Sequence, residues 1–130
     1  MDTALTLYPL LRYRDARAAI AFLAEAFGFA EHEVTEHDGV VVHAELSYGT
    51  GIVMLGTLGA GDGLWDLAPN GVYVAVDDPD AHYARAVAAG AEIVMALTDT
   101  DYGSRNYAAR DPEGNVWSFG TYRPAPERPV

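Results

Sequence analysis

The sequence contains no cysteine, so neither disulfides nor thiolate metal sites can contribute to its structure. It has no apolar run approaching the roughly 20 residues that a membrane-spanning helix needs. The N-terminus lacks a basic stretch followed by an apolar one, so no secretory signal is expected. These absences favour a cytoplasmic protein that does not bind a membrane.

Basic side chains are also scarce. The chain has 8 Lys and Arg against 19 Asp and Glu, which gives a net charge of -11. Such a surface repels a phosphate backbone, so we expect no binding to nucleic acid. It would attract a cationic small molecule, although a solvated acidic surface is the simpler explanation of the same charge. With 130 residues, half of them apolar, the chain is long enough to fold as one domain with its own core.

Apolar and turn-forming residues alternate in a pattern that predicts both helices and strands. In the first half, Pro9 places the first strand near a sheet edge, because proline cannot donate to the ladder. Asp15 is expected to cap a helix that Gly28 ends. We expect strands at 5–13, 30–36, 40–48 and 51–55, with a turn at His37-Asp38-Gly39.

The strand at 40–48 alternates in polarity, and this predicts which side chains share a face. His43 and Glu45 would lie on one face, and Val42, Ala44 and Leu46 on the other. A tight turn after Tyr48 would place Glu45 opposite Met54, with both side chains on the same side.

The second half repeats this order. The spacing from Asp77 to Gly90 equals that from Asp15 to Gly28, and Asp77 or Asp78 would cap the second helix. Strands are expected at 71–77, 92–97, 104–110 and 116–122, with a turn at 111–115. We predict a single domain over 1–125, with module one at about 4–57, a linker at 58–70, module two at 71–123 and a flexible tail at 124–130.

Three segments resemble the vicinal-oxygen-chelate superfamily, which includes glyoxalase I, extradiol dioxygenases, fosfomycin-resistance proteins and bleomycin-resistance proteins. They are LYPLLRYRDARAAIAFLAEAFGF, HAELSYGTGIVML and YGSRNYAARDPEGNVWSFGTY. The resemblance implies an α+β fold, in which two βαβββ modules form curled, mostly antiparallel sheets around a concave pocket. The helices would cover the convex side, and the protein would be a homodimer.

In metal-dependent members of this superfamily, His and Glu side chains from four strands bind one divalent ion. Carried over residue by residue, those positions fall on Tyr8, Met54, Gly71 and Ser118. None is a His, Asp or Glu, so the resemblance implies no metal of the family type, and we expect no cofactor. His43 and Glu45 could still supply two ligands of a rebuilt site, although a polar pair lining the pocket is the simpler explanation.

Without a metal, the concave surface would be a binding surface in which aromatic side chains contact a planar ligand. The expected ligand-binding residues are Tyr8, Leu10, His43, Glu45, Ile52, Met54, Trp65, Tyr73, Tyr102 and Ser118. Trp117 and Phe119 are expected beneath a helix as core, and His82 is expected to be solvated on a helix surface.

These observations predict a metal-independent binding protein, close to the bleomycin-resistance type, that sequesters a bulky aromatic natural product or antibiotic. No catalytic residue is assigned. The alternative is a metal-dependent lyase, isomerase or dioxygenase with a site rebuilt around His43 and Glu45. A regulatory module with no ligand of its own is a third hypothesis.

Overall fold

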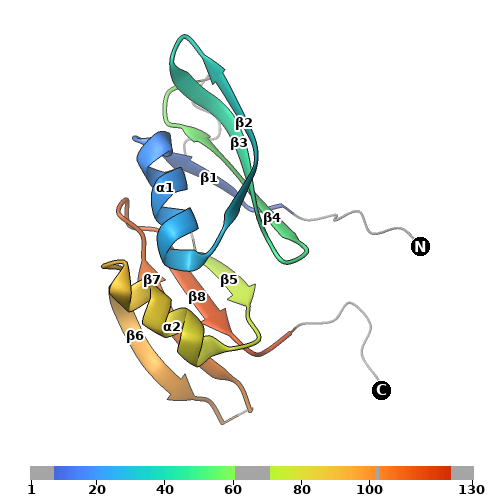
Figure 1. The fold of residues 1–130 in the computed structure, drawn as a ribbon, viewed down its shortest axis with the longest axis vertical. Helices are drawn as coiled ribbons and strands as arrows, with labels where there is room; N and C mark the ends of the chain where they lie inside the picture. The colour runs from blue at the N-terminus through green and yellow to red at the C-terminus, as the bar shows by residue number, and fades with distance from the viewer. Residues whose placement is uncertain (1–7, 61–70, 102, 124–130) are drawn as a thin grey trace, which may run out of the picture.

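A computed structural model describes residues 8–60, 71–101 and 103–123, which form two modules of the same order (Figure 1). Module one consists of β1 (Leu10–Tyr13), α1 (Ala16–Phe27), β2 (Ala30–His37), β3 (Val40–Tyr48) and β4 (Gly51–Thr57). Module two consists of β5 (Gly71–Ala75), α2 (Pro79–Ala88), β6 (Glu92–Asp99), β7 (Arg105–Arg110) and β8 (Val116–Gly120). The predicted α+β fold with two equivalent modules is confirmed.

Each module builds its own sheet, in the strand order β1-β4-β3-β2 or β5-β8-β7-β6. The first strand pairs in parallel with the last, and the remaining pairs are antiparallel. Leu10 lies opposite Met54 in module one, as Tyr73 lies opposite Ser118 in module two. Both sheets are open, so the expectation of curled sheets is wrong. The helices α1 and α2 lie on the same side of the molecule and contact each other (Figure 1).

Local signals place the helix ends. The Asp15 side chain accepts a hydrogen bond from Ala18 N at 3.0 Å, and Gly28 ends α1 with a φ of 82°. That left-handed conformation suits glycine, which has no Cβ to clash. In α2 the cap is Asp78, whose carboxylate accepts from Ala81 N at 3.1 Å, rather than Asp77. Both helices therefore begin at an Asp, as the sequence predicts.

The β3–β4 hairpin has the predicted register, with Tyr48 opposite Gly51 and Glu45 opposite Met54. The prediction that Val42 shares a face with Ala44 and Leu46 is wrong, because Val41 is buried with those two side chains and Val42 is only half-buried. The pairing of β2 with β3 shifts just before this point, and such a bulge moves the alternation by one residue. The first strand also begins later than expected, at Leu10.

Aromatic side chains from both modules form one shared core. The ring centroid of Phe27 in α1 lies 4.8 Å from that of Phe119 and 5.7 Å from that of Trp117, both in β8. Both β8 rings are fully buried, as the sequence predicts. The two modules of one chain therefore pack against each other through the helix-covered faces of their sheets.

His82 belongs to this core, so its predicted solvent exposure is wrong. Only 7% of His82 is exposed. Its Nε2 donates to the carbonyl oxygen of Phe27 at 2.8 Å, and its Nδ1 accepts from the Tyr107 hydroxyl at 2.6 Å. Arg85 donates to the carbonyls of Glu25 and Ala24. His82 is thus buried because it binds a C-terminal carbonyl of α1, whereas the neighbouring Arg85 binds two more of these carbonyls from an exposed position.

The turn at 111–115 binds the opposite end of α1. The buried Asp111 carboxylate accepts from the Tyr13 hydroxyl at 2.6 Å and from the Trp117 indole at 3.0 Å. The Glu113 carboxylate accepts from the backbone N–H groups of Arg14 and Asp15, at 2.7 and 2.8 Å. Module two therefore contacts both ends of the first helix.

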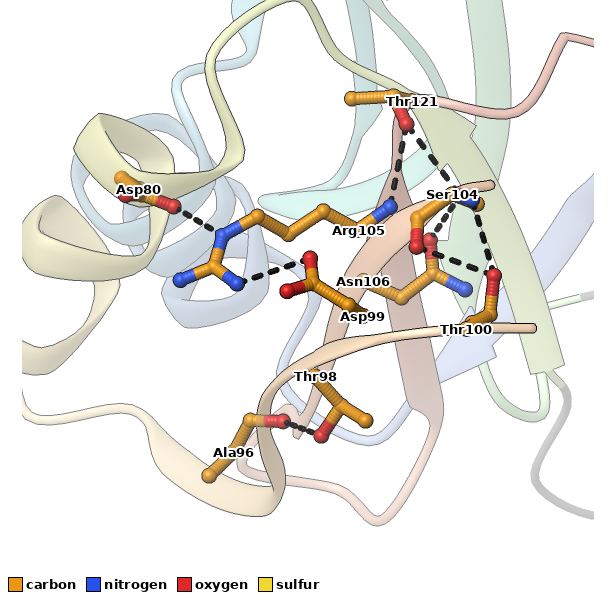
Figure 2. A network of polar contacts seen from close by, with 9 residues as sticks. All are labelled: Asp80, Ala96, Thr98, Asp99, Thr100, Ser104, Arg105, Asn106 and Thr121. Carbon is orange, nitrogen blue, oxygen red and sulfur yellow. Dashed lines mark hydrogen bonds and ion pairs between the residues drawn. The ribbon is translucent and has the colours of Figure 1, made fainter. Parts of the chain in front are cut away.

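A polar network fixes the β6–β7 hairpin to the rest of module two (Figure 2). Arg105 forms ion pairs with Asp80 at 2.7 Å and with Asp99 at 3.0 Å, which links β7 to α2 and β6. The Ser104 hydroxyl donates to Oδ1 of Asn106 at 2.5 Å. None of the helices in the described ranges is both long and apolar enough to span a membrane.

Candidate functional site

A cleft of about 370 Å³ lies where the β3–β4 hairpin of module one meets β5 of module two. Aliphatic residues of β4 and of the segment from β5 to Val76 form much of its wall. Its aromatic walls are Phe29, Tyr48 and Tyr73, and it is also lined by an ion pair in which Arg123 Nη2 lies 2.8 Å from Asp77 Oδ1. The cleft is therefore large enough, and apolar enough, to hold part of an aromatic molecule.

Tyr48 joins this cleft to the shared core. Its ring lies 5.5 Å from Phe29 and 5.7 Å from His82, centroid to centroid. Burial raises the pKa of the Tyr48 hydroxyl above its ordinary value of 10.0, and the negative charge of Asp77 raises it further. The hydroxyl consequently stays protonated near neutral pH and can donate a hydrogen bond to a ligand.

Several predicted binding residues form a row across the open face of module one's sheet. The strand register places Leu10, Met54 and Glu45 side by side. The Glu45 carboxylate lies 2.9 Å from Nε2 of His43 and 3.8 Å from Nε2 of His32. The row thus contains the apolar side chains of Leu10 and Met54 and the carboxylate of Glu45, which lies within 4 Å of two imidazoles.

The predicted residues of module two form a second row on the other sheet. Tyr73 pairs with Ser118 across β5 and β8, and the Tyr73 hydroxyl donates to the Tyr122 carbonyl at 2.6 Å. The two rows lie on different sheets. Among the predicted residues that the structure describes, Tyr73 and Ile52 line the cleft between the modules. Tyr8 is half-exposed just before β1, and Trp65 and Tyr102 lie outside the described residues.

Phe29, Tyr48, Asp77 and Arg123 also line the cleft, although no sequence pattern predicts them as site residues. Tyr48 ends β3 next to a turn, and no local signal indicates that it meets a strand of the other module. The contact depends on how the two modules pack, which the repeat pattern does not specify.

The residues present do not fit a metal ion of the superfamily type. Within the described part of the chain, no group of three or more His, Asp or Glu side chains is arranged to hold a metal ion. His43 and Glu45 bind each other, and Met54 and Ser118, on which the resemblance places two of the family's ligand positions, carry no imidazole or carboxylate. We therefore derive no reaction step through a metal.

The profile of the Glyoxalase/Bleomycin resistance protein/Dioxygenase superfamily matches residues 6–119. The chain belongs to this superfamily. It is 35% identical over 123 residues to the uncharacterized protein Rv0887c of Mycobacterium tuberculosis (strain ATCC 25618 / H37Rv), a match covering 88% of this chain and 72% of that protein. An uncharacterized protein of Mycobacterium bovis, Mb0911c, is equally similar and is covered to 81%.

Among solved structures of the superfamily fold, TioX from Micromonospora sp. ML1 is 35% identical, with a TM-score of 0.76. The match covers 88% of this chain and 98% of TioX. UcmS2 is 17% identical at a TM-score of 0.74, with 92% and 98% of the two chains covered. A lactoylglutathione lyase from Agrobacterium tumefaciens is 20% identical at 0.70, with 90% and 92% covered. The last two show similarity of fold alone.

Proposed function

We propose that this member of the superfamily is a metal-independent small-molecule-binding protein of the cytoplasm. It would sequester a bulky aromatic natural product or antibiotic without transforming it. Lowering the free concentration of such a molecule requires a fitting surface and no proton transfer. The observation that carries the proposal is the pair of equivalent rows on the open sheet faces. They pair Leu10 with Met54 and Tyr73 with Ser118, and neither Met54 nor Ser118, on which the resemblance places metal ligands, is a His, Asp or Glu.

The cleft between the modules supports the same proposal. Phe29, Tyr48 and Tyr73 can contact the flat face of an aromatic ligand, and the Tyr48 hydroxyl can donate a hydrogen bond. The net charge of -11 would also draw a ligand with a basic group toward the protein. Aromatic contacts would then hold its planar part.

We also propose that the protein acts as a homodimer. Each sheet has one face covered by a helix and one face open, and Leu10 and Met54 on that open face are only half-buried. A second copy laid over this face would enlarge the surface available to a ligand. Sedimentation equilibrium of the full chain tests this proposal, and a monomer at tens of micromolar protein would contradict it.

Calorimetric titration and thermal shift against aromatic, intercalating and glycopeptide antibiotics test the binding function. We expect at least one class to bind at micromolar concentration and to raise the melting temperature by mass action. Tyr73→Ala should weaken that binding about tenfold, since an aromatic contact contributes about 0.5–1.5 kcal/mol beyond its buried area. Tyr83→Ala, which removes a tyrosine outside the cleft, should leave binding unchanged. No binding by any class would refute the proposal.

The alternative is a metal-dependent lyase, isomerase or dioxygenase with a site rebuilt around His43 and Glu45. The observation in its favour is the second imidazole, His32, at 3.8 Å from the Glu45 carboxylate. Metal analysis of the purified protein separates the two functions. Stoichiometric Zn, Ni, Fe or Mn that is lost in Glu45→Ala would favour the enzyme.

A further inference from the structure

One arginine, Arg12, differs from the other described arginines in its side-chain contacts. All 8 basic residues are arginines, and the structure describes seven of them. Six bind a carboxylate or the carbonyls of a helix end: Arg14, Arg17, Arg85, Arg105, Arg110 and Arg123. Arg12 makes no hydrogen bond or ion pair with any described residue, and its Nε is buried without a partner. A buried donor without a partner costs free energy, so its presence calls for a reason.

The surroundings of Arg12 hold its guanidinium on the open face of the first sheet. Its neighbours Leu11 and Tyr13 point to the helix-covered side and are fully buried, so Arg12 points the other way. It lies opposite Gly56, where a Cβ would collide with Nη1 of Arg12 and lie 2.7 Å from the Val42 carbonyl. The glycine thus leaves the space that the guanidinium occupies.

In module two, a different polar side chain occupies the space beside the equivalent glycine. Gly120 on β8 corresponds to Gly56, and a Cβ there would collide with Oδ1 of Asn106. That oxygen accepts a hydrogen bond from Ser104 at 2.5 Å (Figure 2), so the polar group in this gap has its partner within the chain. The strand position equivalent to Arg12 is Ala75. The unpartnered cation is therefore specific to module one.

The acid on the same face is already engaged. Glu45 lies in the neighbouring row, and its carboxylate is contacted by His43 at 2.9 Å and by His32 at 3.8 Å. These imidazoles come from β3 and β2, the two strands that lie farthest from β1 in the strand order of the sheet. Glu45 is thus held toward them, and no carboxylate among the described residues pairs with the guanidinium of Arg12.

We propose that Arg12 anchors a carboxylate group of the bound ligand. A guanidinium presents two parallel N–H donors that match a carboxylate, and the terminal nitrogens of Arg12 bind no described residue and are not buried as its Nε is. This inference rests on the proposed binding function and adds an acidic group to the ligand. Gly56 lies four residues from the cleft residue Ile52 on the same strand, about 13 Å at 3.3 Å per residue. A bulky ligand can span that distance and contact both.

The test compares benzoate with its uncharged isostere benzamide, at constant ionic strength and up to tens of millimolar. The Nε–Hε signals of the arginines are followed by NMR, and the Arg12 signal is assigned by its loss in Arg12→Gln. We expect benzoate to shift the Arg12 signal saturably, with an affinity about tenfold above that of benzamide. Arg12→Gln should abolish this preference. Arg17→Gln, which removes an equal charge from the surface of α1, should preserve it.

An Arg12 signal that benzoate does not move, or a preference that survives in Arg12→Gln, would overturn the proposal. Arg12→Lys adds a second check, since it keeps the charge and loses the planar fork. We expect it to retain only part of the preference, and full retention would show a general charge effect instead. The antibiotic titrations give an independent result. Aromatic ligands that bind equally well to wild type and Arg12→Gln would leave the binding function standing without an anchored carboxylate.

Discussion

His82→Leu should destabilise the protein by about 2–6 kcal/mol. The substitution keeps an apolar side chain in the shared core but removes both hydrogen bonds of the imidazole. The Phe27 carbonyl, 2.8 Å from Nε2, loses its partner, and the Tyr107 hydroxyl loses its 2.6 Å bond to Nδ1 and keeps only a 3.4 Å bond to the backbone carbonyl of residue 82. Each buried polar group that loses its close partner costs about 1–3 kcal/mol, which gives the stated range.

Urea denaturation followed by circular dichroism measures this loss as a change in the free energy of unfolding. His37→Leu is the matched control, because His37 lies at an exposed turn and its side chain is 80% exposed. We expect a change within about 0.5 kcal/mol there. A loss below about 1 kcal/mol for His82→Leu would refute the conclusion that this side chain joins the two modules.

The same imidazole should make stability depend on pH. Burial lowers the pKa of His82 below its ordinary value of 6.5; the hydrogen bond to Phe27 opposes this, and the charge of Arg85 adds to it. Below pH 6.5 the unfolded chain therefore binds a proton that the native chain does not. Stability contributed by His82 is full above pH 6.5 and falls as the pH drops toward the native pKa, by at most about 1.4 kcal/mol per pH unit. This slope should be absent from His82→Leu in urea titrations between pH 5.5 and 7.5, and an equal slope in both proteins would contradict it.

Two further predictions concern stability. Asp111→Ala should cost about 3 kcal/mol or more in urea denaturation, because hydrogen bonds to its buried carboxylate contribute about 1.5–3 kcal/mol each, whereas Asp101→Ala at an exposed position should cost little. Gly56→Ala should lower the melting temperature measured by calorimetry, since its Cβ collides with Arg12 and lies too close to the Val42 carbonyl. In the double variant Gly56→Ala with Arg12→Ala we expect partial recovery, and no recovery would show that the backbone contact alone is responsible.

The parts of the fold that short-range signals determine could be predicted from the sequence. Asp15 and Gly28 define a helix through their own backbone preferences, and the tight turn after Tyr48 sets a hairpin register. The position of Val42 could not be predicted, because a bulge depends on how the neighbouring strand pairs. The burial of His82 was missed for a similar reason.

In the candidate site, too, short-range signals predict some residues, and packing between distant segments determines the others. The rows on the open sheet faces follow from strand alternation and from the repeat, so Leu10 and Met54 could be placed together from the sequence. The cleft depends on packing between residues far apart in the chain, such as Tyr48 and Tyr73. Arg12 was not predicted as a site residue, because its lack of a partner is visible only when the surroundings of every arginine are known.

The contacts at the two ends of α1 make the duplicated modules unequal. Ala19 in α1 and His82 in α2 occupy the same helical position, since each donates its backbone N–H to the carbonyl of the capping Asp. Of these two residues the histidine alone binds the other helix, and among the described residues Glu113 in the second module's turn binds the start of α1. If the chain arose by gene duplication, these contacts were acquired by one copy after fusion. Replacing module two by a second copy of module one would remove His82 and the turn that carries Glu113, and with them these contacts to both ends of α1.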